Sequence, residues 1–226
     1  MELFRRLLPD AAVDLTADDV VAAVPAPAPA DRPFVFVNMI ATADGRATIA
    51  GRTGPIANRA DYELFHALRG RVDAVMVGAE TVRVEGYGPM EATGVVASRS
   101  VDLPAEVGLL RAPGNRVVVL TPSENAELPP CPAEVHYLRG PLEEGVRRLR
   151  TELGIESVDC EGGPHLLGAL LRARLVDELH LVIAPKLVAG PDPLTTVAGP
   201  ALDPPADLRL LSLHESGGYL FLRYGT

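Results

Sequence analysis

The chain has 226 residues, of which 47% are hydrophobic and 23% are charged. This composition is that of a globular protein able to bury a sizeable core. A formal charge of −9 at pH 7 argues against nucleic acid as a partner, because phosphates require a basic face. No apolar run is long enough to cross a membrane, and the first nine residues do not form a signal peptide, so we expect a cytoplasmic protein.

The cysteines and histidines show no motif. Cys131 lies between prolines and Cys160 ends an apolar strand pattern, and we interpret both as structural thiols in a reducing compartment rather than as a disulfide. The five histidines lack the spacing of metal ligands. The sequence therefore indicates no metal site.

The first 31 residues differ in character from the rest. Thr16 and Asp19 have the spacing of a capping box and predict the start of a short helix. Residues 25–29 alternate proline with alanine and predict a stiff, extended linker. We interpret residues 1–31 as an arm that packs on the domain or on a partner subunit, with a disordered arm as the alternative. Residues 32–226 then form the main domain.

From residue 32 onward, apolar strand-like runs alternate with amphipathic helical ones, which is typical of an α/β protein. We predict a mainly parallel sheet with an antiparallel C-terminal edge, formed by a hairpin of residues 208–214 and 219–224. Residues 85–114 read as a long, irregular active-site loop with a weak helix at best. The other predicted strands cover 34–41, 73–78, 116–121, 134–138, 157–161 and 177–184, and the predicted helices cover 58–70, 142–153 and 164–172.

The most informative segment is Glu161-Gly162-Gly163-Pro164, which joins a strand to a helix. Two glycines let backbone approach a ligand closely, and proline suits the first helical turn. The free N–H groups of such a helix start form an anion site that suits a pyrophosphate. A tight turn without a ligand accounts for the glycines about equally well. Glu161 favours function, because a carboxylate at the end of a buried strand is costly unless it is paired or used.

A second segment repeats this pattern with Gly78, Thr81 and Arg83. Thr81 offers a hydroxyl to a phosphate or ribose, while Arg83 either screens a phosphate or is a solvated surface residue. Two glycine-bearing strand ends in one sheet suggest a dinucleotide lying across them. Neither segment matches GxGxxG, which argues against a Rossmann-type site.

Four further polar positions stand out. Asn38 interrupts an apolar strand and must find hydrogen-bond partners in the protein or a ligand. Asp44, followed by Gly45, has the simpler reading of a turn. Asp61 and Arg69 lie near the two ends of a predicted helix, where the helix dipole is a sufficient structural reason for each.

Together these segments resemble the reductase family of riboflavin biosynthesis, the C-terminal half of the bifunctional deaminase–reductase. The likeness runs from about residue 32 to the C-terminus, and no zinc-deaminase signature precedes it. The anchors are Asn38, Thr42-Ala-Asp44-Gly45, Gly51-Arg-Thr-Gly54, Leu64-Phe-His-Ala-Leu-Arg69, Asp73-Ala-Val-Met-Val-Gly78, Thr81-Val-Arg83, Glu161-Gly-Gly-Pro164, Leu167-Gly-Ala-Leu170, Leu175-Val-Asp-Glu-Leu179 and Ala184-Pro-Lys-Leu187.

The resemblance implies a dihydrofolate-reductase-like fold with helices on both faces of a mixed sheet, NADPH as hydride donor, and a homodimer. The expected catalytic positions are Asp44, Glu161 and Asp61: either Glu161 or Asp44 would lie near the developing cation, and Asp61 would hold the pyrimidine. The expected substrate contacts are Asn38, Asp61 and Arg69, with Arg69 on the phosphate. The implied cofactor-binding positions are Thr42, Gly45, Gly54, Ile56, Gly78, Thr81, Val82, Thr121, Ser123, Glu161, Gly162, Gly163, Pro164 and Leu166.

One segment departs from the family pattern. The riboflavin enzymes typically follow Thr-Val with Asp-Asp-Pro and a downstream arginine that recognise the phosphoribosyl group, whereas this chain has Val84-Glu-Gly-Tyr-Gly-Pro89, and no arginine follows until Arg99. The leading hypothesis is reduction of 5-amino-6-(5-phosphoribosylamino)uracil. The alternatives are reduction of dihydrofolate or another pterin with the same cofactor, and a non-catalytic module that binds NADPH.

Overall fold

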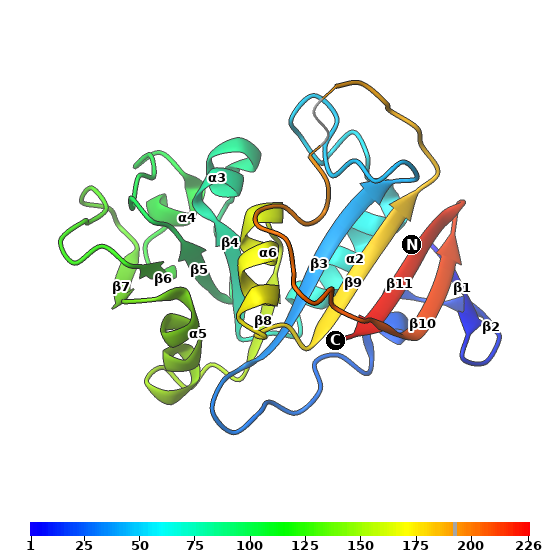
Figure 1. The fold of residues 1–226 in the computed structure, drawn as a ribbon, viewed down its shortest axis with the longest axis horizontal. Coiled ribbons are helices and arrows are strands. Elements are labelled where there is room, and N and C mark those ends of the chain that lie inside the picture. The colour runs from blue at the N-terminus through cyan, green and yellow to red at the C-terminus, as the bar shows by residue number, and fades with distance from the viewer. Residues whose placement is uncertain (192–193) are drawn as a thin grey trace.

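The protein is described by a computed structural model that covers residues 1–191 and 194–226. Its centre is one sheet with the strand order β2-β1-β10-β11-β9-β3-β8-β4-β5-β6-β7 (Figure 1). Each neighbouring pair from β9 to β7 is parallel, and each pair from β9 to β2 is antiparallel. The strands are β1 (Phe4–Leu8), β2 (Ala12–Leu15), β3 (Phe34–Thr42), β4 (Ala74–Gly78), β5 (Thr93–Ala97), β6 (Arg116–Thr121), β7 (Glu134–Arg139), β8 (Ser157–Cys160), β9 (Glu178–Ala184), β10 (Arg209–Ser216) and β11 (Tyr219–Gly225).

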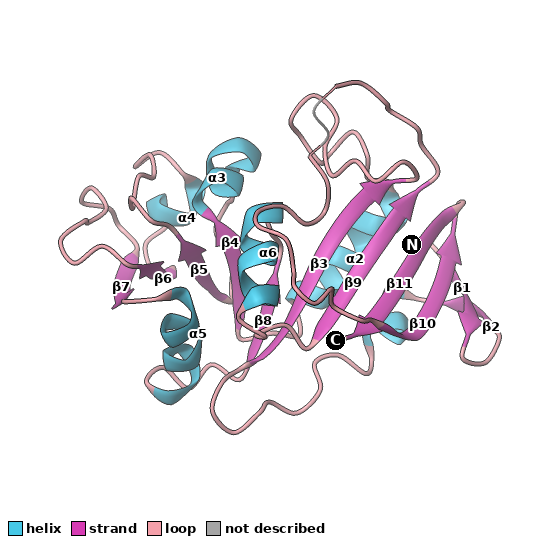
Figure 2. Cartoon of the chain, viewed as in Figure 1, coloured by secondary structure: helices cyan, strands magenta, loops and turns pink. Residues whose placement is uncertain are grey.

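Helices cover both faces of this sheet, as expected (Figure 2). Alternate residues of each central strand point to opposite faces, so Val35 packs with α5 and α6 whereas its neighbour Phe36 packs with α2. The helical segments are α1 (Ala17–Val21), α2 (Arg59–Arg69), α3 (Ala79–Thr81), the π-helical turn η1 (Val82–Gly86), α4 (Gly108–Arg111), α5 (Leu142–Thr151) and α6 (Pro164–Arg172).

The C-terminal hairpin is not at the edge of the sheet, so that part of the prediction is wrong. β10 pairs on its outer side with β1, and β1 pairs with β2. The N-terminal segment therefore supplies the last two strands, and Phe4 is buried against Phe221 with 5.1 Å between ring centroids. The predicted capping box is confirmed, since Thr16 and Asp19 cap α1 reciprocally.

Residues 85–114 are more ordered than the sequence suggests. They contain the parallel strand β5 and the short helix α4. Gly94 made β5 look irregular, yet the fold requires a glycine there, because a Cβ at this position would lie 2.8 Å from Leu109 Cδ1. β5 adds one more strand C-terminus to the edge of the sheet at which parallel strands bind ligands.

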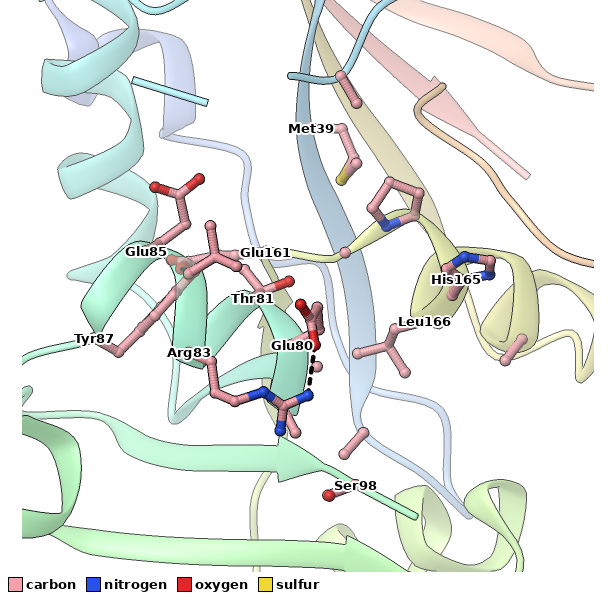
Figure 3. A pocket seen from close by; sticks show the side chains of 18 of the residues that line it. Met39, Glu80, Thr81, Arg83, Glu85, Tyr87, Ser98, Glu161, His165 and Leu166 are labelled. Atoms are coloured by element: carbon pink, nitrogen blue, oxygen red, sulfur yellow. Dashed lines mark hydrogen bonds and ion pairs between the residues drawn. The ribbon is translucent and has the colours of Figure 1, made fainter. Parts of the chain in front are cut away.

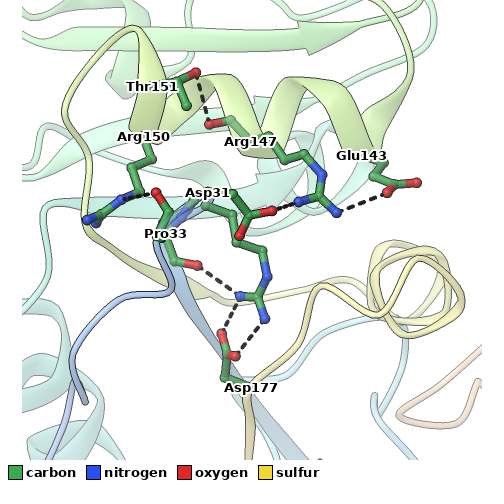
Figure 4. A network of polar contacts seen from close by, with 9 residues as sticks. Asp31, Pro33, Glu143, Arg147, Arg150, Thr151 and Asp177 are labelled. Atoms are coloured by element: carbon green, nitrogen blue, oxygen red, sulfur yellow. Dashed lines mark hydrogen bonds and ion pairs between the residues drawn. The ribbon is translucent and has the colours of Figure 1, made fainter.

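The entry into β3 is anchored by ion pairs (Figure 4). Arg32 donates two hydrogen bonds of 2.6 and 2.7 Å to the Asp177 carboxylate, and Asp31 pairs with Arg147 of α5. The bidentate Arg32–Asp177 pair is half-buried, and this geometry makes it the stronger of the two contacts. It fixes the start of β3, whose central residue Asn38 lines the cleft described below.

Candidate active site

One large cleft of about 1140 Å³ runs along the carboxyl ends of the parallel strands. Strands of an α/β sheet place ligands at this edge. The cleft brings together most of the sequence-predicted residues that carry polar chemistry, although they come from distant segments of the chain. The predicted residues that line it are Asn38, Asp61, Arg69, Gly78, Thr81, Thr121, Glu161, Gly163, Pro164 and Leu166.

The middle of the cleft is a backbone cradle formed by two glycine-bearing strand ends. The Gly78 N–H donates a 2.7 Å hydrogen bond to the Gly162 carbonyl. A Cβ on Gly163 would lie 3.0 Å from Thr81 Oγ1, and a Cβ on Gly162, whose φ is +96°, would lie 3.1 Å from Met39 Sδ. α6 begins here with Pro164 and has no side-chain cap. The open helix start and the close backbone approach fit a pyrophosphate.

A cationic end of the cleft lies beyond β5 and β6. Ser98, Arg99 and Ser100 follow β5, and Thr121 is the last residue of β6. Arg99 is exposed, whereas Arg83 donates 2.5 and 2.6 Å hydrogen bonds to Glu80 and to a backbone carbonyl (Figure 3). Residues 98–100 were not predicted as part of the site, because β5 was not predicted. The signal was present, since an apolar run of residues 95–97 is followed directly by polar residues.

The opposite end of the cleft contains Asp61 on the first turn of α2. Asn58 caps this helix by accepting a 2.9 Å hydrogen bond from the Asp61 N–H. The Asp61 carboxyl makes no hydrogen bond to the part of the chain that the structure describes. Burial raises the pKa of Asp61 to about 6. A carboxyl with free oxygens and a pKa near neutrality is suited to proton transfer.

Beside Asp61, the structure joins three residues into one polar cluster. The Glu161 carboxylate, whose side chain is 1% exposed, accepts 2.5 and 2.6 Å hydrogen bonds from Arg69 Nε and Nη2. The Tyr87 hydroxyl donates a third hydrogen bond of 2.8 Å, and the guanidinium lies over the Phe65 ring, 4.2 Å from its centroid. Figure 3 shows Tyr87 and Glu161 side by side. Two residues predicted to face the substrate separately are therefore paired with each other.

A second carboxyl lies beneath this cluster, two residues before Glu161 on β8. Asp159 is fully buried, and neither of its carboxyl oxygens has a hydrogen-bond partner among the described residues. Burial, and then the nearby charge of Glu161, raise the pKa of Asp159 well above its ordinary value. Burial therefore favours the protonated form of Asp159 beneath the ion pair of Arg69 and Glu161.

Asp44 lies outside the lining of the cleft. Its carboxylate accepts a 2.5 Å hydrogen bond from the Thr42 hydroxyl and a 2.8 Å bond from the Ala189 N–H. These bonds, the hydroxyl first, lower the pKa of Asp44 to about 2. The contacts show a carboxylate that ties two loops together. The other predicted residues that do not line the cleft are Thr42, Gly45, Gly54, Ile56, Val82, Ser123 and Gly162.

Comparisons with known proteins agree with this geometry. The RibD C-terminal domain family matches residues 33–220. The chain belongs to this family. A reductase from Methanothermobacter thermautotrophicus, named for 2,5-diamino-6-ribosylamino-4(3H)-pyrimidinone 5′-phosphate, is 33% identical over 82% of the chain and 93% of its own length. An Aquifex aeolicus reductase of the same name is 27% identical over 75% of the chain and 84% of its own length. This RibD C-terminal domain protein is thus a reductase of the riboflavin-biosynthesis type.

Solved structures show the same fold. A pyrimidine reductase-like protein from Corynebacterium diphtheriae is 25% identical, with a TM-score of 0.74, over 93% of this chain and 98% of its own. A dihydrofolate reductase from Enterococcus faecalis, complexed with NADP(H), has a TM-score of 0.52 at 14% identity over 85% of this chain and 95% of its own. The predicted dihydrofolate-reductase-like fold is therefore confirmed.

Proposed function

We propose that this chain is a cytoplasmic, NADPH-dependent reductase that acts on 5-amino-6-(5-phosphoribosylamino)uracil. The observation that carries the proposal is the single cleft in which a glycine cradle adjoins a half-buried carboxyl whose pKa is near neutrality. Membership of the RibD C-terminal domain family supports the reductase chemistry. The two cysteines are unpaired, which suits a reducing compartment.

The cleft fits a phosphorylated dinucleotide. The turn at Gly162 and Gly163 carries no side chain that could obstruct a pyrophosphate, and the start of α6 offers N–H groups that no side chain caps. At the adenosine end, the exposed Arg99 guanidinium would hold a 2′-phosphate, which NADPH has and NADH lacks. When bound, the nicotinamide supplies the hydride, and the chain supplies orientation and charge.

The reaction needs one proton at the substrate. Opening the ribose breaks the C1′–O4′ bond, leaves its electron pair on O4′ and creates an iminium at C1′, which the hydride reduces. Asp61 in its protonated form would donate the proton to O4′, since its carboxyl oxygens are free of the described residues and face the cleft. The Glu161 carboxylate, held by Arg69 and Tyr87, would stabilise the iminium electrostatically.

Arg69 keeps one donor edge available for the substrate phosphate. It contacts Glu161 through Nε and Nη2, and Nη1 has no hydrogen-bond partner among the described residues. A guanidinium can therefore hold the carboxylate and a phosphate at once.

Reduction of a pterin such as dihydrofolate is the second candidate. The observation that favours it is the sequence of η1 and the residue after it, where Glu85 and Tyr87 line the cleft. A negative charge at this position disfavours a phosphate but not a pterin, whose N–C–N edge would pair with the Asp61 carboxylate. In both candidates the cofactor site is the same.

The test is oxidation of NADPH by the purified protein with three compounds offered in parallel: the phosphoribosylaminouracil, the corresponding diaminopyrimidinone 5′-phosphate and dihydrofolate. We expect oxidation with the uracil. Oxidation with the pyrimidinone alone would show that the chain is a reductase whose substrate is the pyrimidinone. Oxidation with dihydrofolate alone would establish the second candidate. Binding of NADPH with no oxidation in any arm would mean a non-catalytic module.

We also propose a homodimer formed through the sheet face of β9, β11 and β10 that α2 does not cover. This face, which no helix covers (Figure 1), carries the half-buried Leu181 and Leu222 and the 36% exposed Leu220. Burial of such a patch is the usual reason for its presence. Leu222→Arg should halve the mass in solution measured by light scattering, and the matched surface change Leu153→Arg should not. A wild-type monomer would refute the dimer.

A further inference from the structure

Asp159 occupies a position in β8 where an apolar residue is expected. Its cross-strand neighbours are Phe36 of β3 and Val75 of β4, which are 0% and 1% exposed. The adjoining residues Val158 and Cys160 point to the opposite face, into the core that α5 and α6 cover. Asp159 is itself fully buried and does not line the cleft. Any role that it has in the reaction must therefore pass through a neighbouring side chain.

The Asp159 carboxyl destabilises the fold as the structure shows it. Neither oxygen has a hydrogen-bond partner among residues 1–191 and 194–226. A buried polar group without a partner costs free energy that an apolar side chain of similar size does not. Burial, and then the charge of Glu161, raise the pKa of Asp159 well above its ordinary value, against a smaller opposing effect of Arg69. The fold thus keeps a neutral acid, with an O–H group to donate, inside an apolar layer.

Glu161, two residues further along the chain, is an acceptor suited to this O–H group. The Glu161 N–H donates a 2.9 Å hydrogen bond to the Met76 carbonyl, which continues the ladder between β8 and β4. The two carboxyl side chains therefore lie on the same face, with Cα atoms about 6.6 Å apart along the strand. A carboxylate accepts about four hydrogen bonds, and Glu161 accepts three from the described side chains of Arg69 and Tyr87. It can accept one more.

Arg69 serves two anions in the proposed reaction. Its Nε and Nη2 atoms hold Glu161, while Nη1 would bind the anionic group of the substrate. A phosphate carries about two negative charges, so it competes with Glu161 for one guanidinium and weakens the two existing bonds. The Glu161 side chain is 1% exposed and cannot exchange these bonds for water. The buried carboxylate then needs another donor from within the fold.

We propose that Asp159 is a positioning residue that, in its protonated form, donates a hydrogen bond to Glu161 when the anionic group of the substrate engages Arg69. The inference rests on the proposed function, because it takes Glu161 as the group that faces the reacting carbon. The bond needs only a rotation of side chains, and no proton is transferred: Asp159 stays neutral and Glu161 stays ionised. A carboxylic acid kept neutral by an apolar site is an effective donor to an anion.

The test compares wild type with Asp159→Asn, which keeps a donor of the same shape, and Asp159→Val, which has none. Asp159→Val should lower kcat by roughly five- to tenfold with the Kd of NADPH unchanged. It should also raise Tm by about 2–4 °C, because it removes an unpaired buried polar group. Asp159→Asn should keep kcat within about twofold of wild type. The control Cys160→Ala, on the opposite face of β8, should lower Tm and leave kcat unchanged.

A direct readout of the buried acid accompanies the kinetics. The infrared difference spectrum of wild type against Asp159→Asn at pH 7 should contain the C=O stretch of one protonated carboxyl. The absence of this band, a fall in Tm in Asp159→Val, or equal kcat losses in Asp159→Val and Asp159→Asn would overturn the proposal. Wild-type kcat in Asp159→Val would overturn it too.

The kinetics are measured with the phosphoribosylaminouracil and with dihydrofolate, which carries carboxylates as its anionic groups. If wild type reduces dihydrofolate and not the uracil, the proposed substrate fails. The same order of the three Asp159 forms with dihydrofolate would then still support the positioning role. Turnover of the uracil that Asp159→Val leaves intact would remove the positioning role and keep the proposed function. A wild type that reduces neither compound would overturn both.

Discussion

The cofactor end and the substrate end of the cleft are lined by different kinds of groups. The cofactor end is mainly backbone, and a Cβ on Gly162 or Gly163 would lie only 3.1 or 3.0 Å from a neighbouring side chain. The substrate end consists of charged side chains that bind one another, as Glu161 and Arg69 do. The function of a glycine turn depends little on the surrounding residues, whereas the function of a charged side chain depends on the residues that it contacts.

The largest effect is expected at Asp61. Asp61→Asn removes the proposed proton donor and should lower kcat by about a hundredfold or more. Because burial raises the pKa of Asp61 to about 6, the protonated form dominates below that pH, so wild-type kcat should fall as pH rises above about 6. The variant should lose this limb of the pH profile. Steady-state kinetics from pH 5 to 8 measure kcat and its pH dependence, and fluorescence titration of NADPH is the control. Equal losses in kcat and NADPH affinity would exclude the role.

The next effect concerns the backbone cradle. Gly163→Ala places a Cβ 3.0 Å from Thr81 Oγ1 and fills the space proposed for the pyrophosphate. The Kd of NADPH should rise by roughly thirtyfold, which corresponds to about 2 kcal/mol. Titration of the folded variant, verified by circular dichroism, tests this. Gly114→Ala, at a positive-φ turn away from the cleft, controls for general strain. Unchanged NADPH binding in Gly163→Ala would place the cofactor elsewhere.

A smaller effect should separate the two nicotinamide cofactors. Arg99→Gln removes the exposed cation at the adenosine end and should raise the Kd of NADPH by about tenfold without changing that of NADH. Arg111→Gln, in a segment that does not line the cleft, is the matched control. Parallel weakening of both cofactors would show that Arg99 does not recognise the 2′-phosphate.

The smallest effect is expected at Tyr87. Tyr87→Phe keeps the ring beside Arg69 but deletes the hydroxyl that donates to Glu161. Loss of one hydrogen bond costs of the order of 1 kcal/mol, so kcat should fall by about fivefold while NADPH affinity is retained. Tyr62→Phe, at a side chain exposed on α2, should have no effect. A Tyr87→Phe enzyme with wild-type kcat would show that the hydroxyl does not position Glu161.

Much of the fold could be predicted from local pattern. The helix at 164–172 and the strand at 116–121 were placed to the residue, because Pro164 fixes one start and a continuous valine run marks the other. β1 and β2 could not be predicted in this way, since β1 pairs with β10 about 200 residues away. β5 was missed because Gly94 lowers local strand propensity, although tertiary packing against Leu109 requires it.

In the site, too, local sequence patterns predicted some residues, whereas contacts between distant segments could not be predicted. The glycine turn and Asp61 could be predicted as site residues from the sequence, because the glycines follow a predicted strand and Asp61 lies at the start of a predicted helix. The pairing of Arg69 with Glu161, and the Tyr87 hydroxyl that completes it, depend on segments 92 and 74 residues apart meeting in space. Glu85 gave no sequence signal for the hydrogen bonds that it accepts from Thr53, because neither residue follows a motif that specifies a partner.

The most direct test of the central claim is to follow the hydride. NADPH deuterated at the transferable C4 position should deliver one deuterium to C1′ of the ribityl product, which mass spectrometry would detect as a gain of about one mass unit in a fragment containing C1′. The account predicts stoichiometric transfer in wild type and loss of product formation, with NADPH binding retained, in Asp61→Asn. NADPH oxidation without deuterium in the product, or a product labelled elsewhere, would contradict a single cleft that joins cofactor and pyrimidine.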